Sequence, residues 1–119
     1  MRRTIQRVLF VCGRARLRSP TAEQVFSGYP GLEVACAGVS ADADEPVTAE
    51  HVAWADLIVV MERGHRSKIQ RRFRVALWDA RLVCLDIPDR YGFMDPDLVR
   101  LLEAKVPPLL ARGRPQALP

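Results

Sequence analysis

Short apolar runs rich in β-branched residues alternate with helix-like segments along most of the chain, and this alternation constrains the fold more than any other feature. The runs cover residues 8–11, 32–36, 57–61 and 82–85. Their length and composition are typical of strands that are buried on both faces of a sheet. The alternation predicts an α/β fold, a three-layer sandwich in which helices cover both faces of a four-stranded parallel sheet.

The segments between the runs carry helix signals. Ser19 is a predicted N-cap, with Pro20 as the first helical residue. Further helices are expected at about 48–55, 62–73 and 95–106. In parallel α/β sheets the ligand lies beyond the carboxyl ends of the strands. The loop that follows the first strand is therefore the first place to look for a functional site.

Length and composition narrow the class of protein. The 119 residues fit one domain, spanning 1–119, and the tail after about residue 112 is expected to be poorly ordered. Hydrophobic residues make up 49% and charged residues 27%, as in soluble globular proteins, and no apolar run approaches the roughly 20 residues of a membrane helix. The net charge of +4 predicts affinity for anions: nucleic acid, an acidic membrane surface or a phosphorylated substrate.

Cysteine usage points to a reducing compartment. Cys12, Cys36 and Cys84 are odd in number and widely spaced, which suits neither a disulfide framework nor a zinc site. The basic start is followed by only five apolar residues after Arg7, and no cleavage site of small residues appears. We expect a cytoplasmic protein that holds no metal and no cofactor.

The loop at residues 12–19 combines the groups that phosphoryl transfer requires. Cys12 lies at a strand end beside a helix N-terminus and near Arg18, two positive influences that favour a thiolate. Arg18 offers a planar fork for two phosphate oxygens, and Ser19 is expected either to cap the helix or to donate a hydrogen bond to the sulfur. The backbone amides can converge on an anion. The predicted substrate-binding residues of the loop are Gly13, Arg14, Ala15, Arg16, Leu17 and Ser19. The alternative interpretation is a buried thiol beside ordinary surface charges.

Four stretches of the sequence resemble one known family. They are residues 8–12, residues 18–23, Ala37-Gly38 and residues 54–61. Together they are similar to the low-molecular-weight protein tyrosine phosphatases, and more narrowly to a compact bacterial subgroup of predicted tyrosine phosphatases. The resemblance extends from residue 8 to about 110. It implies hydrolysis of phosphotyrosine or related aryl phosphates without metal, on a phosphorylated protein or a small aryl phosphate, with inorganic phosphate as product.

The resemblance also implies roles for individual residues. Cys12 attacks phosphorus and forms a phosphocysteine, while Arg18 and the loop amides hold the phosphoryl oxygens. The family's general acid lies in a loop after the fourth strand, where Asp89 is the nearest match; the other aspartates there are Asp86, a strand-end residue, and Asp95, an N-cap. Tyr91 is expected to form an aromatic wall for the substrate or to pack across the loop.

Two loop positions depart from the family pattern. Ala15 stands where asparagine usually braces the loop, and Arg14 stands where glycine is common. A left-handed backbone at Arg14 would cost roughly 1–2 kcal/mol, so this residue takes an allowed conformation or the loop is strained or reshaped. Arg14 and Arg16 either raise the affinity for anions or face an acidic partner. Arg90 replaces the proline that usually follows the acid. These changes open the possibility of reduced activity.

Three other functions compete with this interpretation. Arsenate reduction uses a similar loop, but it needs a relay of cysteines that Cys36 and Cys84 do not complete. A phosphate-binding or phosphoprotein-binding module would keep Arg18 without turnover. Nucleic-acid binding is suggested by a basic segment whose cations are Arg63, Arg66, Lys68, Arg71, Arg72 and Arg74. We favour a solvated helix face for this segment, because no aromatic platform interleaves the charges. His51 and His65 are expected to have surface or packing roles.

Overall fold

The sheet matches the predicted architecture. The computed structural model describes residues 5–77 and 80–110. Its strands are β1 (Gln6–Cys12), β2 (Leu32–Gly38), β3 (Leu57–Val60) and β4 (Arg81–Cys84). All pairings are parallel, in the order β2-β1-β3-β4. The central pair, β1 and β3, is flanked on both sides, which explains why these two strands are the most apolar.

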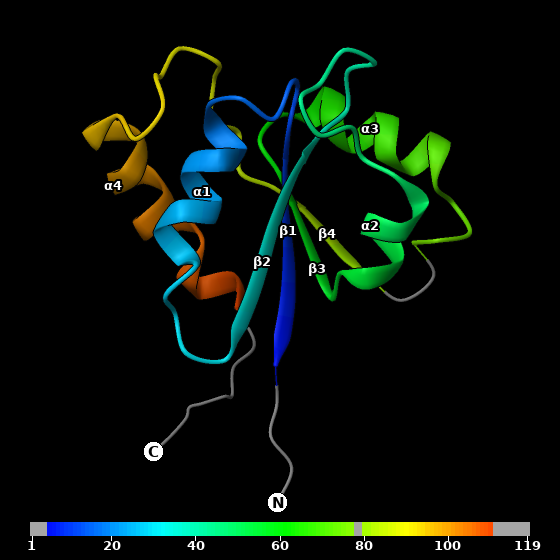
Figure 1. The fold of residues 1–119 in the computed structure, drawn as a ribbon, viewed down its shortest axis with the longest axis horizontal. Coiled ribbons are helices and arrows are strands. Elements are labelled where there is room, and N and C mark those ends of the chain that lie inside the picture. The colour runs from blue at the N-terminus through cyan, green and yellow to red at the C-terminus, as the bar shows by residue number, and fades with distance from the viewer. Residues whose placement is uncertain (1–4, 78–79, 111–119) are drawn as a thin grey trace, which may run out of the picture.

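The helices cover both faces of this sheet, as expected. They are α1 (Arg18–Phe26), α2 (Ala49–Trp54), α3 (Arg63–Arg72) and α4 (Pro96–Lys105), followed by the short 3₁₀ helix η1 (Pro107–Leu109). Figure 1 shows α1 and α4 on one side of the sheet and α2 and α3 on the other. The three-layer prediction is therefore confirmed. The tail after about residue 112, which was predicted to be poorly ordered, lies outside the described residues.

Side chains that alternate along β1 divide the core into two halves. Phe10 and Cys12 point toward α1 and α4, and the Phe10 ring stacks on Phe26 with centroids 5.7 Å apart. Leu9 and Val11 point toward α2 and α3. Burial of both faces explains why residues 8–11 form a continuous apolar run rather than an alternating one.

The start of α1 differs from the prediction. The N-cap is Leu17, which makes no side-chain capping bond, and Ser19 already lies inside the helix. Ser19 is fully buried, and its hydroxyl turns toward Cys12 instead of toward the helix end. The predicted cap of α4 is confirmed, because Asp95 accepts from the amide of Asp97. The helix expected at about 48–55 is α2, and its N-cap is Thr48, which accepts from the amide of His51.

Four segments meet at the carboxyl edge of the sheet. The residues that follow β1, β2, β3 and β4 all leave their strands at this edge, which is the upper edge in Figure 1. The predicted loop after β1 therefore lies next to residues from the other three strand ends. Among the described residues, no helix is both long and apolar enough to cross a membrane.

Candidate active site

A pocket of about 520 Å³ opens at this edge, directly over the predicted loop. The loop residues that line it are Cys12, Gly13, Arg14, Arg16, Leu17 and Arg18. The helix α1 begins at Arg18, so its N-terminal amides lie beside the pocket. The nucleophile candidate and the cation candidate therefore share one pocket at a helix N-terminus, an arrangement suited to phosphate.

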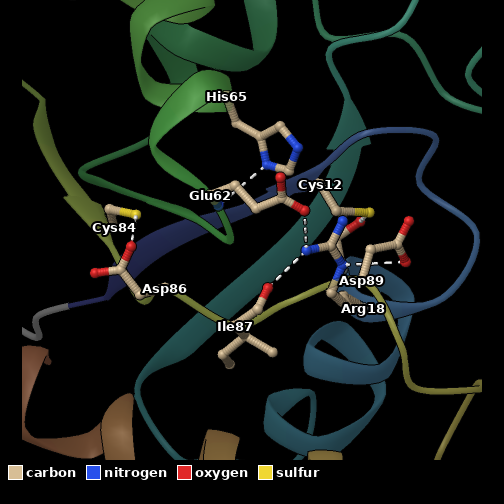
Figure 2. Close-up of polar contacts among 9 residues, drawn as sticks. Cys12, Arg18, Glu62, His65, Cys84, Asp86, Ile87 and Asp89 are labelled. Atoms are coloured by element: carbon tan, nitrogen blue, oxygen red, sulfur yellow. Dashed lines mark hydrogen bonds and ion pairs between the residues drawn. The ribbon is translucent and has the colours of Figure 1, made fainter.

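Arg18 is held in place by three groups. Its side chain is only 4% exposed, and Nη1 donates to Glu62 Oε2 at 2.6 Å and to the Ile87 carbonyl at 2.7 Å (Figure 2). Its Nε lies 3.7 Å from Asp89 Oδ1. Because one Nη group is taken by these partners, the orientation of the guanidinium plane is fixed before any ligand binds.

Cys12 and Ser19 form a buried pair behind the loop. The sulfur is 3.0 Å from Ser19 Oγ, and either atom could donate the hydrogen bond. The same hydroxyl also lies 3.5 Å from the Ala37 carbonyl, to which it can donate. When the sulfur is a thiolate, only Ser19 can donate to it, so the hydroxyl would stabilise the charged form. Ser19 does not line the pocket.

The left-handed residue of the loop is Ala15 rather than Arg14. Ala15 has φ 59°, whereas Arg14 is absent from the positive-φ residues of the described chain. Ala15 is buried under the loop and does not line the pocket. The loop is tied to the segment after β2, because Val39 N donates to the Cys12 carbonyl at 3.0 Å and Ser40 N donates to the Gly13 carbonyl at 2.8 Å.

The two arginines on the rim are paired within the chain. Arg14 Nη2 lies 3.5 Å from Asp42 Oδ2, and Arg16 Nε lies 3.0 Å from Asp44 Oδ1. All four side chains are about half exposed. Exposed pairs of this kind contribute little to stability and exchange readily, so both guanidiniums remain accessible to a ligand at the pocket mouth.

The three aspartates after β4 have different surroundings. Asp89 lines the pocket beside Arg18. Asp86 has its Oδ1 3.5 Å from Arg63 Nε and accepts from Cys84 Sγ, and Asp95 caps α4. Neither Asp86 nor Asp95 is among the lining residues. Tyr91 also lies outside the lining and packs against the core between the sheet and α4.

Sequence reasoning missed three residues that line the pocket: Ser40, Glu62 and His65. A surface or packing role was expected for His65; its side chain is buried and lines the pocket. Burial lowers the pKa of its imidazole; the Glu62 carboxylate opposes this shift and the Arg18 guanidinium adds to it. Glu62 and His65 follow β3, whose carboxyl end adjoins that of β1 in the sheet. A sheet order in which the third strand lies beside the first would have predicted that residues after the third strand reach the loop.

The other two thiols stay outside the pocket. Burial, together with the Glu23 carboxylate, raises the pKa of Cys36 to about 12. Burial also raises the pKa of Cys84. Both side chains are therefore protonated at neutral pH, which does not favour a thiolate relay.

The predicted basic segment forms α3 and the turn that follows it. Two of its cations contact other parts of the chain: Arg63 pairs with Asp86, and Arg72 Nη1 donates to the Val39 carbonyl at 3.0 Å. Arg72 also lies over the Phe73 ring, with its guanidinium carbon 5.1 Å from the centroid. In this way part of the charge run has a structural role.

Comparison with known proteins agrees with this geometry. No family model matches the chain. A protein-arginine-phosphatase of Geobacillus stearothermophilus is 30% identical, in an alignment that covers 56% of this chain and 62% of the relative. The solved arginine phosphatase YwlE of the same organism has a TM-score of 0.67 at 25% identity, over 82% of this chain and 88% of that one. A low-molecular-weight protein tyrosine phosphatase of Streptococcus pyogenes has a TM-score of 0.71 at 14% identity, over 92% and 96%.

The chain has the low-molecular-weight phosphatase fold. The resemblance inferred from the four sequence stretches is thereby confirmed, and the candidate pocket is formed by the loop that follows the first strand of this fold. The chain spans less than two thirds of the length of the curated relative that it matches.

Proposed function

We propose that the protein is a cysteine-dependent phosphomonoester hydrolase that acts on phosphotyrosine or related aryl phosphates and needs no metal or cofactor. The observation that carries the proposal is the shared pocket of Cys12, Arg18 and Asp89, in which the guanidinium is already oriented by Glu62. A phosphorylated protein is the proposed partner, inorganic phosphate the product and the cytoplasm the proposed location. The arginine and tyrosine phosphatases with the same fold support this assignment.

The first step transfers the phosphoryl group to sulfur. Cys12 Sγ attacks phosphorus opposite the ester oxygen, the S–P bond forms and the P–O bond to the aryl group breaks. Asp89 gives its proton to the departing oxygen, which leaves as a phenol. Arg18 and the loop amides hold the remaining phosphoryl oxygens, where charge is concentrated in the transition state.

The second step releases phosphate. Asp89, now a carboxylate, takes a proton from a water molecule as that water attacks phosphorus. The S–P bond breaks, the sulfur leaves as a thiolate that Ser19 hydrogen-bonds, and inorganic phosphate departs. Protons balance over the two steps, and Asp89 returns to its starting form.

Hydrolysis of an aryl phosphate in the presence of EDTA tests the proposal. We expect turnover by the wild type at mildly acidic pH and none by Cys12→Ser. Asp89→Asn should lower kcat by about 10²–10⁴-fold, the usual contribution of a general acid. Asp86→Asn and Asp95→Asn are matched controls, since neither aspartate lines the pocket, and each should keep most of the activity. If the reduced wild type shows no turnover, the hydrolase proposal is wrong and a phosphate-binding module replaces it.

The identity of the leaving group, a phenol or the guanidine of an arginine, distinguishes two candidate substrates of this site. The arginine phosphatases among the similar proteins favour phosphoarginine as a second candidate substrate. The acidic side of the pocket fits a guanidinium, because Asp89 and Glu62 already flank Arg18 there. Matched peptides that carry phosphotyrosine or phosphoarginine distinguish the two, because the larger kcat/KM identifies the substrate. With phosphoarginine the P–N bond breaks in the first step and Asp89 protonates the departing guanidine nitrogen, while the second step is the same.

A further inference from the structure

His65 is the buried polar side chain of the pocket to which the mechanism gives no task. It is 8% exposed, projects from the first turn of α3 and lines the pocket together with Cys12. Figure 2 shows the imidazole extending from α3 toward the Cys12 side of the site. Buried polar groups are almost always hydrogen-bonded, so a buried imidazole that faces a pocket is expected to find a partner in the protein or in a bound ligand.

The hydrogen bonds of the ring fix its tautomer. The backbone amide of Glu62 donates to His65 Nδ1 at 3.2 Å, as part of the capping box of α3. Nδ1 therefore provides a lone pair, and the proton of the neutral ring is on Nε2. Burial lowers the pKa of His65, with Arg18 adding to the effect and Glu62 opposing it, so the neutral form prevails at neutral pH.

The Nε2–H group faces the floor of the pocket. Nε2 lies 3.9 Å from the point where a Cβ on Gly13 would be, and Ser40 Oγ lies at the same distance from that point. Within the described residues, Nε2 makes no hydrogen bond or ion pair, whereas Nδ1 accepts from the Glu62 amide. A donor of this kind, held rigidly beside the backbone of Gly13, is placed to meet an anion bound over the loop.

We propose that His65 binds substrate, donating a hydrogen bond from Nε2 to a phosphoryl oxygen on the Gly13 side of the loop. This inference rests on the proposed phosphatase function, because it assumes that the pocket holds a phosphoryl group. A neutral donor complements Arg18: it stabilises the bound oxygen without placing a second cation next to the guanidinium. It also links α3 directly to ligand binding.

The chain offers a control that separates this role from helix capping. His51 occupies the same third position in the capping box of α2, where its Nδ1 accepts from the Thr48 amide at 3.0 Å, and it does not line the pocket. Glutamine is a standard residue at this position of a capping box. His65→Gln and His51→Gln should therefore both keep the cap, and only His65→Gln removes the imidazole Nε2–H from its place beside Gly13. His65→Phe removes every side-chain donor at this position.

The experiment measures the affinity for inorganic phosphate by calorimetry at neutral pH, in a Cys12→Ser background that cannot turn over. We expect His65→Gln and His65→Phe to weaken binding by about 3- to 10-fold, the usual effect of losing one neutral hydrogen bond. His51→Gln should bind as tightly as the parent. Nitrogen NMR of His65 should show a proton on Nε2, with a shift of that resonance when phosphate is added.

Two results would overturn the proposal: phosphate affinity unchanged in both His65 variants, or a free protein in which the His65 proton is on Nδ1. Failure of the phosphatase function gives a different pattern. In that case wild-type turnover is absent, while phosphate binding still depends on His65. Normal Cys12-dependent turnover combined with unchanged affinity in the His65 variants removes the inference and leaves the phosphatase function intact.

Discussion

Ala15 carries backbone strain in the loop that follows β1. Its φ of 59° is favourable for glycine and tolerated by asparagine, but it places the alanine Cβ close to a carbonyl oxygen. The sequence showed an unusual residue at this position, yet it did not show which loop residue is left-handed. That depends on how the loop closes against the segment after β2, through bonds such as the one from Ser40 N to the Gly13 carbonyl.

Replacing this alanine should relieve the strain. A left-handed backbone at a non-glycine residue costs roughly 1–2 kcal/mol. Glycine removes this cost, but it increases the backbone entropy of the unfolded chain and loses the buried methyl group, so the net gain in stability is smaller. We predict that Ala15→Gly raises the free energy of unfolding by about 0.5–1 kcal/mol in urea titrations. If Ala15→Gly is less stable than the wild type, the burial of the alanine methyl group contributes more than the strain costs, and the prediction is wrong.

The residues of the proposed active site differ in how predictable they are. Cys12, Arg18 and Ser19 follow from the sequence, because their spacing and the start of a helix place them together. Glu62 and His65 do not, since their approach to the loop depends on β3 lying beside β1. Asp89 is intermediate: the loop was predicted, but its proximity to Arg18 is a matter of tertiary structure.

At the scale of elements, the end of β2 supports the loop through a very close approach. A Cβ at Gly38 would lie 2.6 Å from the Gly13 carbonyl oxygen and 2.9 Å from Ala15 N, both backbone atoms of the loop. Neither atom can move without changing the loop itself. Gly38 thus allows strand and loop to pack closely, a requirement of space rather than of backbone conformation.

Gly38→Ala should therefore damage both stability and ligand binding. We predict a loss of about 1–3 kcal/mol in the free energy of unfolding, the range for overpacked sites, together with weaker phosphate binding. Gly64→Ala is the matched control, because a Cβ at Gly64 in α3 meets nothing within 4 Å. A Gly38→Ala variant that is as stable as Gly64→Ala would contradict the predicted clash.

Helix α3 should make stability depend on pH. Burial lowers the pKa of His65 below its ordinary value of 6.5, so below that pH the unfolded chain binds a proton more readily than the native one. By linkage, this contribution to stability is fully present above about 6.5 and is lost as the pH falls toward the native pKa. Protonation of Nδ1 would also remove the acceptor for the Glu62 amide.

We predict that the wild type loses stability as the pH falls below about 6.5, and that His65→Gln loses less over the same range. The measurement is the urea midpoint as a function of pH for the two proteins. Parallel curves would show that the pKa of His65 is the same in the folded and unfolded chains.

At the scale of the whole molecule, the strand and helix pattern predicted the architecture well. Periodicity and β-branched runs sufficed for four parallel strands covered on both faces, because this pattern has few alternatives. Errors appeared at boundaries such as the start of α1, where burial of Ser19 beside Cys12 took precedence over its capping preference. The pocket joins four segments that are distant in sequence, those after β1, β2, β3 and β4. The loop after β1 could be predicted from local spacing, whereas the contributions of Ser40, Glu62 and His65 depend on the order of the strands.

The most direct test of the account is to trap the covalent intermediate. Wild-type protein is mixed with an aryl phosphate in EDTA, quenched during turnover and analysed by mass spectrometry of the peptide that contains Cys12. The account predicts one added phosphoryl group on Cys12, none in Cys12→Ala, and a phosphoenzyme that persists longer in Asp89→Asn. Sustained turnover by the wild type with no phosphoryl group on Cys12 would contradict it.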